Sequence, residues 1–165
     1  MSINIINLTF IECKSQSFYI SQSPSNENIN QFITSIKKKN IKHVIRLCKS
    51  TYDFTLIENE KIKFYDIEIP DGSVPNKEII IKWNNIIDSI NKSDSVLVHC
   101  IAGLGRSPLM VAISLINENM DPYDVVNLIR KQNPKSFNSK QLNFLVNYKS
   151  NKKNKFNFFS YLICK

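Results

Sequence analysis

Residues 95–107 have the sequence SVLVHCIAGLGRS, and this stretch decides the fold. Its first five residues, 95–99, form a short apolar run that predicts a buried strand. Residues 107–118 predict a helix, so the segment between them is the loop of a strand–loop–helix unit. Gly103 and Gly105 allow this loop to turn tightly and to point its amide groups inward, because glycine has no Cβ atom.

Strands and helices alternate along the rest of the chain. The predicted strands cover residues 5–10, 18–20, 43–48 and 62–69. The predicted helices begin near residues 29, 77, 122 and 138. This alternation indicates an α/β fold, a single domain whose central, largely parallel sheet is flanked by helices. In such sheets ligands bind beyond the carboxyl ends of the strands, where Cys48 and Cys100 are expected.

The length and composition describe one globular domain. The chain has 165 residues, of which 42% are apolar and 22% charged, and these proportions support a packed core. No apolar run approaches the ~20 residues that span a bilayer. The first residues, MSINIIN, lack the basic and apolar regions of a signal peptide. A cytoplasmic location is therefore expected.

The net charge of +8 favours anionic partners such as phosphorylated substrates. Nucleic acid is not expected among them, because the chain has 19 Lys but three Arg, and Arg makes the bidentate contacts to phosphate and guanine. The four cysteines stand at positions 13, 48, 100 and 164, without a CxxC pair or a close Cys/His cluster. We therefore expect neither a metal site nor a cofactor.

The loop after residue 99 combines a nucleophile with the means to bind an anion. Cys100 precedes a helix N-terminus, where free N–H groups and the helix dipole favour a thiolate and can bind phosphate. Arg106, six residues later, can hold two phosphate oxygens in a bidentate fork. Ser107 can donate a hydrogen bond to the sulfur. We expect Cys100, Arg106 and Ser107 to be catalytic, and phosphate to bind Ile101, Ala102, Gly103, Leu104, Gly105 and Arg106.

A cysteine and an arginine six residues apart also occur by chance, as a buried strand-end cysteine and a solvated helix residue. Here His99 precedes the cysteine, a glycine lies three residues after it, and Ser107 follows the arginine. This combination favours a catalytic loop. It resembles the HCxxGxxR[ST] signature of the cysteine-dependent protein tyrosine phosphatases.

A closer resemblance covers about residues 8–149. The segments similar to the phosphatase of regenerating liver (PRL) family, the type IVA tyrosine phosphatases, are residues 46–48, 51–53, 70–72, 75, 98–108 and 137–142. The resemblance implies the tyrosine phosphatase fold over residues 1–149 and a separate tail over residues 150–165. It also implies dual-specificity hydrolysis of phosphomonoesters through a phosphocysteine intermediate. The implied substrates are phosphoproteins, with phosphotyrosine first and phosphoserine or phosphothreonine as alternatives.

The resemblance assigns roles to two residues outside the loop. Asp71 matches the general acid of the family, although Pro-Asp-Gly is also a common turn sequence. The segment around it lacks the tryptophan that the family usually carries, which leaves closure of this loop open. Cys48 matches a cysteine that forms a reversible, redox-regulated disulfide with the catalytic one. The alternative for Cys48 is a small buried apolar side chain.

Three features depart from related phosphatases. Most animal members of the family carry Ala where this chain has Ser107, and the hydroxyl suggests more ordinary turnover. The apolar loop residues lack the lysine of phosphatases that act on 3-phosphoinositides, which weighs against such substrates. A prenylation motif would require cysteine at position 162, which is leucine, while Cys164 stands second from the end.

The tail also leaves two interpretations open. It is basic and aromatic, so it could hold the protein peripherally on an anionic membrane, or it could simply be solvated. An alternative function also follows from the resemblance: a weakly catalytic binding module that regulates a CNNM-type magnesium transporter through its active-site face. The presence of Asp71, Arg106 and Ser107 together favours catalysis.

Overall fold

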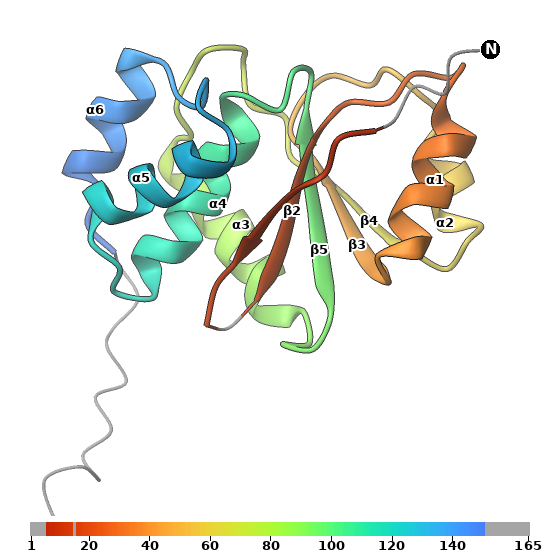
Figure 1. Ribbon diagram of the computed structural model, residues 1–165, viewed down its shortest axis with the longest axis horizontal. Helices are drawn as coiled ribbons and strands as arrows, with labels where there is room; N and C mark the ends of the chain where they lie inside the picture. The colour runs from red at the N-terminus through yellow and green to blue at the C-terminus, as the bar shows by residue number, and fades with distance from the viewer. Residues whose placement is uncertain (1–5, 15, 151–165) are drawn as a thin grey trace, which may run out of the picture.

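The computed structural model describes residues 6–14 and 16–150. Strands and helices alternate along most of this length, as predicted (Figure 1). The strands are β1 Thr9–Glu12, β2 Ser17–Gln22, β3 Ile41–Arg46, β4 Lys63–Asp66 and β5 Ser95–Cys100. The helices are α1 Ile29–Lys38, α2 Thr55–Glu58, α3 Lys77–Ser89, α4 Arg106–Asn117, α5 Pro122–Gln132 and α6 Ser139–Asn147.

The five strands form one sheet in the order β1-β2-β5-β3-β4. The pairs β2–β5, β5–β3 and β3–β4 are parallel, and only β1 is antiparallel to its neighbour among the described strands. Strand β5 therefore lies at the centre, paired on both sides. Parallel strands covered on both faces need apolar side chains throughout, which explains the run Val96-Leu97-Val98, all fully buried. The predicted α/β fold with a largely parallel sheet is confirmed.

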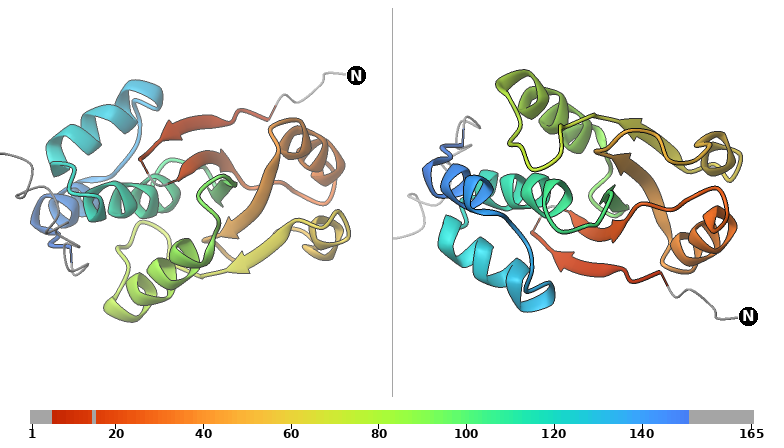
Figure 2. Two further views of the ribbon diagram at one scale, coloured as in Figure 1. Left: turned by 90° about the horizontal axis from the view of Figure 1, so that it is seen from below. Right: turned by 90° about the horizontal axis from the view of Figure 1, so that it is seen from above.

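Helices cover both faces of the sheet. Helices α1 and α2 lie on one side, and α3 to α6 lie on the other (Figures 1 and 2). Leu97 packs with α1 on the first face, whereas Val96 and Val98 face the larger core that contains Trp83 of α3. Helix α4 runs through this larger core, and all of its residues are buried. A helix apolar on most sides is stable only in such surroundings.

All five predicted strands have different boundaries in the structure. Those predicted over residues 18–20, 43–48 and 95–99 are Ser17–Gln22, Ile41–Arg46 and Ser95–Cys100. The first strand, predicted over residues 5–10, is Thr9–Glu12, because its hydrogen bonds follow the pairing of Thr9 with Ile20 and of Glu12 with Ser17. The strand predicted over residues 62–69 ends at Asp66. Beyond Asp66 the amides of Ile67 and Ile69 still donate to the carbonyls of Arg46 and Leu47. The alternation of side chains therefore continues as the chain leaves the sheet.

Helix α2 was not predicted, because its four residues are too short to show helical periodicity. Of the predicted tail, residues 150–165, all but Ser150 lie outside the described residues, and so does Cys164. Among the described residues, no helix is both long enough and apolar enough to cross a membrane.

A hydrogen bond inside the larger core gives a test of the packing of α3 on α4. The indole nitrogen of Trp83 donates to the hydroxyl of Ser114 at 2.9 Å. Ser114→Ala leaves this buried donor unpaired, so we expect the free energy of unfolding to fall by about 1–3 kcal/mol in urea titrations. The control is Ser35→Ala on the exposed side of α1, with an expected change within about 0.5 kcal/mol. Equal effects of the two changes would contradict the prediction.

Candidate active site

Residues 100–106, which we call the phosphate loop, connect the end of the central strand to α4. Cys100 is the last residue of β5 and is almost fully buried. Helix α4 begins at Arg106, and Gly105 at its N-cap position provides no side-chain cap. The first N–H groups of a helix have no partner within it, so they are available to an anion at this end.

Gly103 adopts a conformation that other residues rarely reach. Its φ angle is +71°, and a Cβ atom there would lie 2.7 Å from the carbonyl oxygen of Ser21. The loop therefore rests directly on the end of β2, where the Ser23 amide also donates to the Ile101 carbonyl at 3.1 Å. Gly103 has a structural role at this contact, because only glycine fits both the angle and the space.

The phosphate loop forms the floor of a cleft of about 310 Å³. Of the six predicted phosphate-binding residues, all but Gly103 line this cleft, together with Cys100 and Asp71. The sequence analysis missed the other side of the cleft. This side is lined by Gly72, Lys135, Phe137, Asn138 and Gln141.

The buried guanidinium of Arg106 connects the phosphate loop to residues 69–73, which we call the acid loop. Its Nη1 donates to the Ile69 carbonyl at 3.0 Å, and its Nη2 pairs with the Asp71 carboxylate at 2.8 Å. The Asp71 side chain is nevertheless 90% exposed. The acid loop therefore lies against the cleft without the tryptophan that the family usually carries, and the fully buried Ile69 holds this part of the chain.

Ser107 lies on the first turn of α4, next to Arg106. Its side chain is fully buried, and its hydroxyl has no hydrogen-bond partner in the described part of the chain. The predicted hydrogen bond to sulfur is thus not formed in this state. A buried hydroxyl without a partner is costly.

Cys48 lies beside Cys100 at the same edge of the sheet. Strands β3 and β5 are parallel, Arg46 is in register with His99, and the Leu47 amide donates to the His99 carbonyl at 2.9 Å. Both thiols are free in this structure. Burial raises the pKa of the Cys48 thiol, against the opposing effect of the Arg106 charge.

His99, the residue before Cys100, forms a buried pair with Tyr52. Burial raises the pKa of Tyr52, so its phenol keeps its proton, and it forms a hydrogen bond with Nε2 of His99 at 2.7 Å. Burial first, and then the charge of Arg46, lower the pKa of His99 to about 3. The imidazole therefore remains neutral at ordinary pH.

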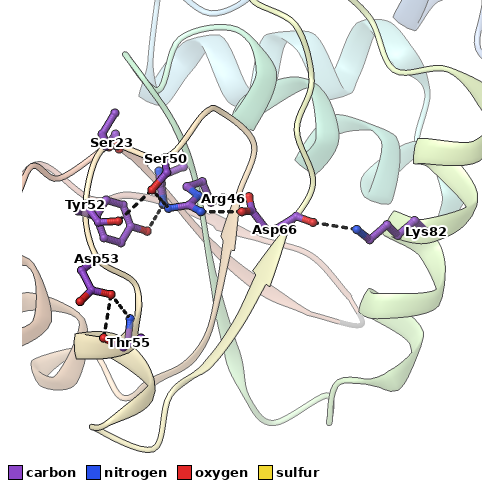
Figure 3. A network of polar contacts seen from close by, with 10 residues as sticks. Ser23, Arg46, Ser50, Tyr52, Asp53, Thr55, Asp66 and Lys82 are labelled. Carbon is purple, nitrogen blue, oxygen red and sulfur yellow. Dashed lines mark hydrogen bonds and ion pairs between the residues drawn. The ribbon is translucent and has the colours of Figure 1, made fainter.

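Arg46 anchors the segment after Cys48, which carries Tyr52. Its guanidinium binds both carboxylate oxygens of Asp66, at 3.1 and 2.6 Å, and donates to Ser50 at 3.0 Å (Figure 3). It also lies over the Tyr52 ring, 5.3 Å from the centroid. Lys82 of α3 extends the network by donating to the Asp66 carbonyl. The sequence analysis assigned no role to this network, because its members come from separate strands and helices.

Comparisons with known proteins agree on one class. A family model described as "Polymorphic toxin system, DSP-PTPase phosphatase" matches residues 20–120. Protein tyrosine phosphatase type IVA 2 of Mus musculus is 36% identical, over 84% of this chain and 85% of its own length. The PRL-1 phosphatase of Drosophila melanogaster is 35% identical, over 84% of this chain and 81% of its own. A solved structure described as a protein tyrosine phosphatase from Leishmania major has a TM-score of 0.79 and 29% identity, covering 87% of this chain and 99% of that one.

Fold and family model together define a protein tyrosine phosphatase of the dual-specificity class. The relatives narrow this assignment, since their similarity extends over more than four fifths of the chain. The chain belongs to the type IVA protein tyrosine phosphatase, or PRL, family and is a phosphoric monoester hydrolase. The predicted resemblance is confirmed.

The neutral state of His99 makes stability depend on pH. The pKa of this histidine is near 6.5 in the unfolded chain and about 3 in the folded one, so between these values the unfolded chain binds more protons. The free energy of unfolding should therefore fall as the pH is lowered below 6.5, by up to about 1.4 kcal/mol per pH unit from this group. His99→Gln should remove this contribution. The measurement is a series of urea titrations of both proteins from pH 7 to pH 4. The same dependence of the free energy of unfolding on pH in both proteins would contradict the prediction.

Proposed function

We propose that this phosphatase hydrolyses phosphomonoesters of proteins through a covalent intermediate on Cys100. The observation that carries the proposal is the convergence of three groups on one cleft. The Cys100 thiol, the Arg106 guanidinium and the Asp71 carboxylate all line it, at the uncapped N-terminus of α4. These are the nucleophile, the anion clamp and the acid that the reaction requires.

In the first step the Cys100 thiolate attacks phosphorus. An S–P bond forms as the bond to the leaving oxygen breaks, and the electron pair moves to that oxygen. Asp71, released from Arg106 and protonated from solvent, donates the proton that the leaving group needs. Arg106 and the loop amides stabilise the charge on the three remaining phosphate oxygens.

In the second step water hydrolyses the phosphocysteine. Asp71, now a carboxylate, accepts the proton of the attacking water as the P–S bond breaks and its electron pair returns to sulfur. The buried hydroxyl of Ser107 supports a role here, because it has no partner in the described residues and can donate to the sulfur as negative charge develops. Inorganic phosphate then leaves.

We expect the substrate to replace the ion pair between Arg106 and Asp71. A phosphate dianion competes with the Asp71 carboxylate for the same guanidinium, while the bond from Arg106 to the Ile69 carbonyl is to a neutral group. Substrate binding therefore frees Asp71 to face the leaving oxygen.

The rim of the cleft supports a phosphotyrosine substrate. Ile101, half exposed, and Phe137 both line the cleft, and such side chains suit an aromatic ring. Relatives named as protein tyrosine phosphatases support the same substrate. Phosphoserine and phosphothreonine are the second substrates that we propose, in keeping with the dual-specificity class.

The alternative of a weakly catalytic binding module is not favoured. The relatives are named as phosphatases, and the groups needed for turnover are present around one cleft. Binding of a CNNM-type magnesium transporter stays a prediction. Membrane contact through the tail stays one as well, since it concerns residues outside the described part of the chain.

Rapid-quench kinetics with an activated aryl phosphate test the mechanism. Wild-type protein should show a small burst followed by steady turnover, and Cys100→Ser should show neither. Ser107→Ala should keep the burst but lower the steady rate about ten- to hundredfold, because a hydrogen bond to a charged group contributes ~1.5–3 kcal/mol. Turnover near the wild-type level in Cys100→Ser would exclude the phosphocysteine. An unchanged steady rate in Ser107→Ala would remove Ser107 from the second step.

A redox switch between Cys48 and Cys100 is a further part of the proposal, supported by their positions on adjacent strand ends. Hydrogen peroxide should convert the Cys100 thiol to sulfenic acid, and the Cys48 thiol should displace water from it to form a disulfide. Peptide mapping should then show a 48–100 linkage in wild type and in a Cys13→Ser control. A thiol reductant should restore activity. Sulfinic acid at Cys100 beside a free Cys48 would disprove the switch.

A further inference from the structure

The connection between α5 and α6 contacts the phosphate loop. The Phe137 amide donates to the Leu104 carbonyl at 2.9 Å, and the Asn133 side chain donates to the Gly103 carbonyl at 3.3 Å. Phe137 has a φ angle of +70°, so the backbone is in the left-handed region where it makes this contact. One side of this connection is thus fixed to the loop that bears the nucleophile.

The next residues of the same segment contact the acid loop. The side-chain amide of Asn138 donates to the Gly72 carbonyl at 3.0 Å. The side-chain amide of Gln141 donates to the Ser73 carbonyl at 3.2 Å. The two carbonyls belong to the residues that directly follow Asp71 in its turn. We call Asn138 and Gln141 together the acid-loop latch.

A capping box sets the orientation of both latch side chains. The Asn138 Oδ1 atom accepts from the Gln141 amide at 2.9 Å, and the Gln141 Oε1 atom accepts from the Asn138 amide at 3.1 Å. Because the oxygens are held by helix α6, the NH2 groups must face the acid loop. Gln141 is buried, and it lies against Gly105, where a Cβ atom would come within 3.0 Å of its Nε2.

The latch contacts differ from the Arg106–Asp71 ion pair in one respect. Phosphate competes for the guanidinium, so the ion pair is lost when substrate binds. The carbonyls of Gly72 and Ser73 are neutral and bind no part of a phosphate, so their hydrogen bonds to the latch persist. The latch is therefore available to hold the acid loop at the moment when Asp71 must donate its proton.

We propose that Asn138 and Gln141 are positioning residues that hold Asp71 over the leaving oxygen in the first step. This inference rests on the proposed role of Asp71 as general acid. The latch does not touch the reacting atoms, and it acts by restricting the acid loop. Its removal should therefore affect only substrates whose leaving groups need a proton.

Two conservative variants separate the latch from the helix cap. Asn138→Ser keeps an N-cap oxygen, and Gln141→Glu keeps the acceptor of the capping box, but each removes the NH2 donor to the acid loop. The control is Asp121→Ser, which exchanges one N-cap residue for another at the start of α5. Asp71→Asn is the reference for loss of the acid. Thermal unfolding midpoints should show that all four variants are folded.

The measurement is the ratio of kcat/KM for an activated aryl phosphate to kcat/KM for a phosphotyrosine peptide. It reports the first step only, and any general effect of a new charge on phosphate binding cancels. We expect the ratio to rise about five- to tenfold in Asn138→Ser and Gln141→Glu, to rise further in Asp71→Asn, and to stay at the wild-type value in Asp121→Ser. In the Asp71→Asn background, Asn138→Ser should cause no further rise.

Two results would overturn the inference, and they are distinguishable. A wild-type ratio in both latch variants, beside a raised ratio in Asp71→Asn, would show that the acid loop keeps its position without the latch. A wild-type ratio in Asp71→Asn itself would show that Asp71 is not the acid, which removes the proposed function of this residue and the latch with it.

Discussion

The cleft depends on the interactions of the buried Arg106 guanidinium with the acid loop. A guanidinium has no neutral form at accessible pH, so it must have partners wherever it is buried. One partner here, the Ile69 carbonyl, is neutral, and the other, Asp71, carries the charge that a phosphate can replace. The same group thus connects the acid loop to the phosphate loop through one neutral and one charged contact.

Arg106 can take this position because of the elements behind it. Strand β5 is paired on both sides, and α4 is buried along its whole length, so the loop between them has fixed ends. Gly103 rests on the end of β2, and the α5–α6 connection holds the Leu104 carbonyl. The shape of this loop therefore comes largely from contacts made by backbone atoms, one of which requires glycine at position 103.

The phosphate loop was predictable because its chemistry is local. Cys100, the glycines and Arg106 lie within seven consecutive residues, and the flanking apolar runs show the strand and the helix. Asp71 needed the family resemblance, since Pro-Asp-Gly alone indicates only a turn.

Asn138 and Gln141 could not be assigned to the cleft, because a helix cap fully accounts for an Asn and a Gln three residues apart. Their contacts with Gly72 and Ser73 span more than sixty residues of sequence. Neither composition nor periodicity carries a signal over such a distance. The same limit applies to Arg46 and Asp66, whose pairing depends on the register of β3 and β4.

The central position of β5 also affects the order in which the protein can fold. Its partners are residues 17–22 on one side and 41–46 on the other, so both pairings close loops of about fifty residues or more. Long-range parallel pairing of this kind is slow and forms late, because the entropy of loop closure comes before the gain from contacts. A nascent chain that has just exposed Cys100 already contains both neighbouring strands, whereas the α5–α6 connection that lines the other side of the cleft emerges later. The cleft is therefore incomplete until this connection has been made, and a chain cut short before α6 would contain Cys100 but lack part of the cleft lining.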